Sequence, residues 1–113
     1  KADHEAIREA LEAMEANLDN DASFTVADLR FHQAVARAGR NDLLAQFYDL
    51  SQRLLSETIE QVVSVRGVKE EALRRQWEVY YAIVAGKADA ARQATLAQLK
   101  YVEQLLQRAG LID

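Results

Sequence analysis

Two residues with titratable side chains lie one helical turn apart in this sequence. Asp28 and His32 are spaced i, i+4, which brings their side chains together on one face of a helix. Phe31 and Val35 share that face, so we expect it to point toward the protein interior. A carboxylate and an imidazole placed in this way can bind one divalent metal ion, or bind an anionic ligand through the imidazolium.

A purely structural interpretation of the same two residues stays open. Thr25 to Asp28 has the pattern of a capping box, with Asp in place of the usual Glu, so Asp28 could hold the backbone N–H of Thr25. His32 could then be a core histidine that is hydrogen-bonded to Asp28. Spacing alone does not decide between a helix cap and a ligand site.

Two glutamines interrupt apolar stripes later in the chain. Gln76 lies on a stripe with Leu73, Tyr80 and Ile83, and Gln98 lies on a stripe with Ala91, Ala94, Tyr101 and Leu105. A buried polar group costs about 1–3 kcal/mol unless it is hydrogen-bonded. Unless they lie at the edges of their stripes, these glutamines must bond to each other, to Asp28 and His32, or to a ligand.

The residue content offers little for catalysis. The chain has two histidines and no cysteine, which excludes a thiol nucleophile and a zinc–thiolate site. Ser51, Ser56 and Thr58 have no histidine near them in sequence, so a hydrolase triad is not expected. Neither a Glu-x-x-His pair nor a glycine-rich phosphate loop occurs. We therefore expect that the protein is not an enzyme.

Length, charge and hydropathy set further bounds. A chain of 113 residues fits one domain. Its net charge of −4 suits nucleic acid poorly, because that affinity depends on Lys and Arg at phosphates. No apolar run approaches the roughly 20 residues that cross a bilayer, and no secretory pattern opens the chain. We expect a cytoplasmic protein with no membrane partner.

Apolar periodicity predicts helices from end to end. With no proline and only four glycines, the fold class is expected to be an all-α antiparallel bundle of about five to six helices. The expected helices run from the capping residue Asp3 to the cluster at Asn17, from about Thr25 to Gly39, from Asn41 to Gly67, from Val68 to Ala85, and from Ala88 to Arg108. The glycines follow the last four helices, where we expect them to adopt the left-handed conformation.

Two segments of this helical pattern resemble a known family. Residues 28–44 read DLRFHQAVARAGRNDLL and are similar to the signature D-x-x-F-H-x-x-[hydrophobic]-x-x-A-[small]-x-N-x-x-L. That signature belongs to the FCD domain, the C-terminal effector-binding domain of FadR-type regulators in the GntR family. Residues 82–92, AIVAGKADAAR, resemble the later A-I-x-x-G-D-x-x-x-A segment of the domain, with Lys87 in place of its Asp. The resemblance extends from about Ala2 to Leu106.

The resemblance implies a bundle that senses a small metabolite, often a carboxylate or sugar acid. It also implies, for many members, a divalent metal held by one Asp and three His. Asp28 and His32 match the first two metal ligands, whereas Gln76 and Gln98 stand at the other two positions. Because amides are weak ligands for zinc-like metals, we expect no tightly bound cofactor and at most a weak divalent metal at Asp28 and His32. The expected ligand-binding residues are Asp28, His32, Gln76 and Gln98.

The sequence therefore predicts one domain, residues 1–113, that binds an effector and forms a homodimer. We expect a fragment without its N-terminal DNA-binding domain, a winged helix-turn-helix that supplies the contact with DNA. Whether the first bundle helix is also missing is left open. The alternative functions are a helical protein-interaction module without a ligand and a metal-dependent bundle enzyme. The effector and the target genes are not predicted.

Overall fold

The described part of the protein is helical throughout. The computed structural model describes residues 2–40, 50 and 58–110, and within these residues it contains no strand. The complete helices are α1 (Ala2–Ala16), α2 (Asp21–Ala38), α4 (Val68–Val84) and α5 (Ala88–Arg108). Residues 58–63 are also helical, and most of the helix predicted from Asn41 lies outside the described residues. The predicted all-α fold is confirmed.

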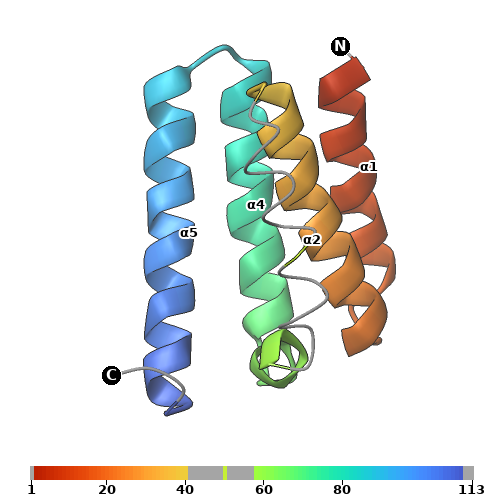
Figure 1. The fold of residues 1–113 in the computed structure, drawn as a ribbon, viewed down its shortest axis with the longest axis vertical. Helices are drawn as coiled ribbons and strands as arrows, with labels where there is room; N and C mark the ends of the chain where they lie inside the picture. The colour runs from red at the N-terminus through yellow and green to blue at the C-terminus, as the bar shows by residue number, and fades with distance from the viewer. Residues whose placement is uncertain (1, 41–49, 51–57, 111–113) are drawn as a thin grey trace.

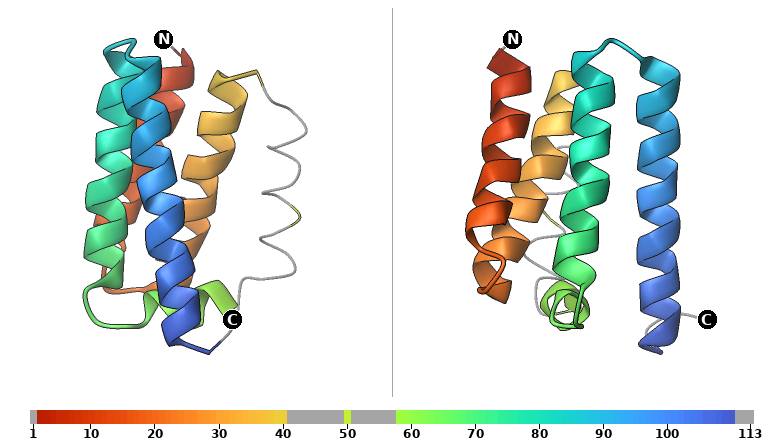
Figure 2. Two further views of the ribbon diagram at one scale, coloured as in Figure 1. Left: turned by 90° about the vertical axis from the view of Figure 1, so that its left-hand side faces the viewer. Right: turned by 180° about the vertical axis from the view of Figure 1, so that it is seen from behind.

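The helices pack as antiparallel neighbours (Figure 1). Helix α1 packs against α2 and α4, and α4 packs against α5. Figure 2 shows α5 on the far side of α4 from α1, so that α5 stands at the margin of the bundle. The core therefore forms where α1, α2 and α4 meet. It contains the following buried side chains: Ile7, Ala10, Leu11 and Met14 of α1, Phe24, Ala27, Phe31 and Ala34 of α2, Ala72, Leu73 and Val79 of α4, and Val63.

The start of α2 differs from the sequence prediction. The helix begins at Asp21 rather than near Thr25, and the Asn20 side chain caps it by accepting a hydrogen bond from Ser23 N at 3.0 Å. Thr25 lies inside the helix, where its hydroxyl donates to the Asp21 carbonyl at 2.8 Å. The predicted capping box is therefore wrong. Asn20 is the better cap because its side-chain oxygen already satisfies an N–H of the first turn.

The other helix boundaries agree more closely with the sequence. Helix α5 has the predicted bounds, and α4 ends one residue earlier than predicted. Helix α1 already includes Asp3 in its first turn, so Asp3 does not cap it. Gly67, Gly86 and Gly110 have positive φ as predicted, but Gly39 has a φ of −82°. The left-handed residue after α2 is Arg40, with a φ of 60°.

Helix α5 is less buried than its apolar stripe predicts. Within it only Gln98 and Leu105 are buried, and Leu96 keeps 57% of its surface exposed. The reason is its marginal position, because α5 packs along α4 and leaves its outer face uncovered. Among the described helices, none is both long enough and apolar enough to span a membrane.

Two glycines give a matched test of this backbone. Gly67 has a φ of +85°, so Gly67→Ala should lower the free energy of unfolding by about 1–2 kcal/mol, the cost of a left-handed alanine. Gly39→Ala should cost much less, because Gly39 has an ordinary φ and a new Cβ would lie 3.7 Å from its nearest neighbours. Urea unfolding of both variants measures the difference. An equal loss in the two variants would contradict the assigned turn.

Candidate functional site

The predicted pair on α2 lies where the sequence placed it. His32 Nε2 is 3.5 Å from Asp28 Oδ1, and the two side chains are 24% and 17% exposed. The ring of His32 also packs edge-on against Phe31, with centroids 5.2 Å apart. The pair is therefore half-buried and held from one side by the core. Because α2 begins at Asp21, Asp28 lies two turns into the helix and is not part of a cap.

Gln76 joins this pair from a second helix. It is fully buried on α4, and its Nε2 donates a hydrogen bond to Asp28 Oδ1 at 2.7 Å across 48 positions of sequence. Asp28 Oδ1 thus lies between an amide N–H and the His32 imidazole. The bond also orients the Gln76 amide, since the opposite orientation would place its carbonyl oxygen against the carboxylate.

Gln98 of α5 lines the same cavity as Asp28, His32 and Gln76. It is 6% exposed, on the face of α5 that turns toward the bundle. Asp28, His32, Gln76 and Gln98 all line one cavity of about 390 Å³. The other lining residues are mostly apolar and come from α2, residues 58–63, α4 and α5: Phe24, Leu29, Ile59, Val62, Val63, Val68, Ala72, Leu99, Val102, Leu105 and Leu106, together with Thr58 and Tyr101.

Two buried oxygen atoms of the cavity lack a donor. Within the part of the chain that the structure describes, no group donates a hydrogen bond to Gln76 Oε1 or to Gln98 Oε1. Each atom belongs to a side chain that lines the cavity. An unsatisfied buried acceptor is unfavourable, so a ligand that donates to these atoms would gain affinity.

Tyr101 is a polar wall residue that sequence reasoning did not select. It lies three positions after Gln98 on α5, a spacing that puts both on one helix face and could have identified it. Arg75 of α4 places its guanidinium 4.8 Å from the Tyr101 ring centroid, and Arg75 is paired with Glu71 at 2.8 Å. Burial, and secondarily the charge of Glu71, raises the pKa of Tyr101. Its hydroxyl therefore stays protonated at neutral pH.

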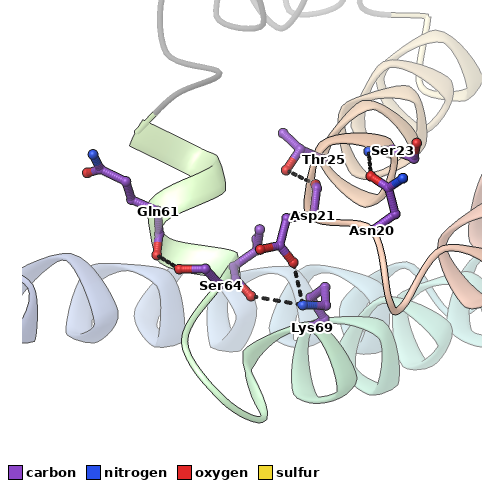
Figure 3. Close-up of polar contacts among 8 residues, drawn as sticks. Asn20, Asp21, Ser23, Thr25, Gln61, Ser64 and Lys69 are labelled. Atoms are coloured by element: carbon purple, nitrogen blue, oxygen red, sulfur yellow. Dashed lines mark hydrogen bonds and ion pairs between the residues drawn. The ribbon is translucent and has the colours of Figure 1, made fainter.

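Lys69 fixes the end of the cavity that Val63 and Val68 line. Its Nζ donates to Asp21 Oδ1 at 2.5 Å and to the Val63 carbonyl at 3.4 Å (Figure 3). The first turn of α4 is thereby tied to the start of α2 and to the end of the helical residues 58–63. Sequence reasoning missed this contact, because nothing local relates Lys69 to Asp21.

A double-mutant cycle tests the bond that joins α2 to α4. We expect Asp28→Ala and Gln76→Met to be coupled by about 1.5–3 kcal/mol in unfolding free energy, the range for hydrogen bonds to charged groups. Asp28→Ala combined with Gln93→Met, at an exposed position of α5, is the matched control and should show no coupling. Equal coupling energies in the two cycles would contradict the contact.

Comparison with known proteins identifies the domain. Residues 1–101 match the model of the FCD domain. A protein of Escherichia coli K12, whose name assigns it to regulation of the L-lactate dehydrogenase operon, is 34% identical over 99 residues, which are 83% of this chain and 38% of that protein. The HTH-type transcriptional regulator LutR of Bacillus subtilis is 33% identical over 112 residues, 94% of this chain and 51% of its own.

The chain therefore spans about half or less of the length of these relatives. No solved structure matches it. Both relatives are named as regulators rather than enzymes, in agreement with the sequence prediction. With a family match over nearly its whole length, this chain belongs to the FCD family, the effector domains of GntR-type transcriptional regulators.

Proposed function

We propose that this domain senses a small organic acid, a carboxylate or sugar acid, and controls a winged helix-turn-helix domain outside this chain. The observation that carries the proposal is that Asp28, His32, Gln76 and Gln98 line one cavity although three helices supply them. A mostly apolar cavity with a few polar groups is typical of small-molecule sites. We propose that the winged helix-turn-helix domain makes the contact with DNA, and that the protein is therefore cytoplasmic.

The packing of α5 suggests how binding is transmitted. Helix α5 packs on α4, and the cavity is lined by Gln98 of α5 and by Asp28 and His32 of α2. A ligand that contacts both walls draws α5 toward α2. Binding then favours one of two packings of the bundle, and the attached domain reads the change. The loosely covered helix is the part that can move at the lowest cost, because few of its side chains are buried.

Two alternative functions have less support. A helical interaction module without a ligand would leave Gln76 and Gln98 at the surface, whereas both are buried. A metal-dependent bundle enzyme needs a full ligand set, and its candidate residues contain two amides in place of imidazoles. The named relatives are regulators, which also favours a sensing role.

The imidazole of His32 provides the most direct test of this function. It is the one basic side chain among the described cavity residues, so it should pair with the carboxylate of the effector. Thermal unfolding is measured with L-lactate, chosen from the operon named for the E. coli relative, and then with longer acids. An acid that binds, present at a free concentration of 100 times its Kd, should raise the unfolding free energy of the wild type by about 2.7 kcal/mol.

His32→Ala should abolish that stabilisation, and His4→Ala on α1 is the control that should retain it. His4 is not among the residues that line the cavity. A full response of the His32 variant would mean that the acid binds elsewhere. No response of the wild type to any acid would contradict the proposed class of effector.

The metal that the family resemblance implies does not fit these residues well. Among the described residues, no group of three or more His, Cys, Asp and Glu side chains is arranged to hold a metal ion. Gln76 directs its N–H toward Asp28 Oδ1, an atom that a metal would need. We propose that the domain binds no tight transition metal and at most a hard divalent cation, weakly, at Asp28 and His32.

Restoring the imidazoles tests this account of the metal. The double variant Gln76→His with Gln98→His should bind zinc or nickel tightly, because one carboxylate and three imidazoles would then line one cavity. Calorimetric titration with each metal measures the gain over the wild type. Gln93→His with Gln104→His, at exposed positions of α5, is the matched control. No gain in the cavity variant would mean that the two glutamines do not converge.

We also propose that the domain is a homodimer. Large apolar side chains remain exposed on α4 and α5, among them Tyr81, Val84 and Leu96. A second copy that covers these side chains would remove their apolar surface from water. Leu96→Glu should shift the protein to monomer in sedimentation experiments, whereas Val26→Glu, an exposed valine on α2, should not. A monomeric wild type would contradict the proposal.

A further inference from the structure

We infer that the cavity recognises its ligand through an ammonium group, and that the ligand is a 2-amino acid with an aliphatic side chain. The inference rests on the proposed function and narrows its class of organic acids. Its basis is the set of acceptor atoms that the cavity presents. These are the two buried amide oxygens of Gln76 and Gln98, together with the carboxylate of Asp28.

The Gln76 side chain presents its carbonyl oxygen to the cavity as a hydrogen-bond acceptor. Its Nε2 already donates to Asp28 Oδ1 at 2.7 Å, and this bond fixes which end of the amide is oxygen. Gln76 is fully buried, and no described group of the protein donates to its Oε1. A ligand that reaches this atom must therefore bring a hydrogen-bond donor.

Gln98 of α5 presents a second such oxygen to the same cavity. It is 6% exposed, and its Oε1 likewise accepts no hydrogen bond from the described residues. The two oxygens come from α4 and α5, so no single helix can satisfy both. A ligand that donates to both oxygens would bridge the two helices.

The number of donor hydrogens and the charge of the ligand group identify the donor. A carboxylate has no hydrogen to give, and a hydroxyl group has one. An ammonium group has three, enough for two amide oxygens and the carboxylate of Asp28. Asp28 is the one acidic side chain among the described cavity residues, and its charge favours a cationic group.

The remaining parts of the ligand follow from the rest of the wall. The carboxylate of an amino acid can pair with the His32 side chain, as in the proposed function. Most of the cavity surface comes from Val, Leu, Ile, Ala and Phe side chains. The cavity volume of about 390 Å³ leaves room for more of the ligand than its ammonium and carboxylate groups. An aliphatic side chain fits these walls.

Three probes with one carbon skeleton test the inference on the full chain. They are L-leucine, L-2-hydroxy-4-methylpentanoate and 4-methylpentanoate, and calorimetric titration measures each Kd. We expect L-leucine to bind at least tenfold more tightly than 4-methylpentanoate, with the hydroxy acid between them. Gln98→Met, which removes one acceptor at similar volume, should reduce the preference for L-leucine, whereas Gln93→Met at an exposed position should not.

Each outcome decides a different point. If 4-methylpentanoate binds as tightly as L-leucine, the ammonium inference is wrong and the organic-acid proposal stands. If the hydroxy acid binds most tightly, the donor is a hydroxyl and the amino-acid class is wrong. If none of the three probes binds, the inference is wrong, and the effector proposal is judged by its own test with His32→Ala. Thermal unfolding of Gln98→Met, compared with the wild type, shows whether that variant is folded.

Discussion

The hydrogen bond from Gln76 to Asp28 joins two residues 48 positions apart in sequence, and both residues line the cavity. It satisfies one oxygen of a half-buried carboxylate and keeps α4 in register with α2. It also fixes the orientation of the Gln76 amide, whose carbonyl oxygen then accepts no hydrogen bond from the described residues. One contact thus stabilises the fold and sets the chemistry of the cavity.

The helices around that contact differ in how tightly they are packed. Helices α1, α2 and α4 share the core, and Lys69 ties α4 to the start of α2. Helix α5 is held by α4, with Arg75 over the Tyr101 ring as one of its contacts, and few of its side chains are buried. A cavity between a rigid wall and a loosely held wall is suited to sensing, because a ligand can change the position of one wall at low cost.

Much of this structure could be predicted from the sequence, and the failures have physical causes. Periodicity gave the all-α fold and the bounds of α5, and the in-stripe position of Gln76 and Gln98 indicated burial. The predicted start of α2 is wrong because the polar residues after α1 include Asn20, which caps the next helix. Partners distant in sequence, such as Lys69 with Asp21, leave no local pattern. The exposure of Leu96 could not be predicted either, because it depends on where α5 packs.

We expect the effector to bind among Asp28, His32, Gln76 and Gln98. Side-chain amide resonances measure this most directly, because Gln76 and Gln98 line the cavity whereas Gln93 and Gln104 are exposed on α5. A ¹⁵N NMR titration with an acid that stabilises the protein should shift the Gln76 and Gln98 signals and leave those of Gln93 and Gln104 in place. Saturable binding that leaves the Gln76 and Gln98 signals unchanged would contradict the account.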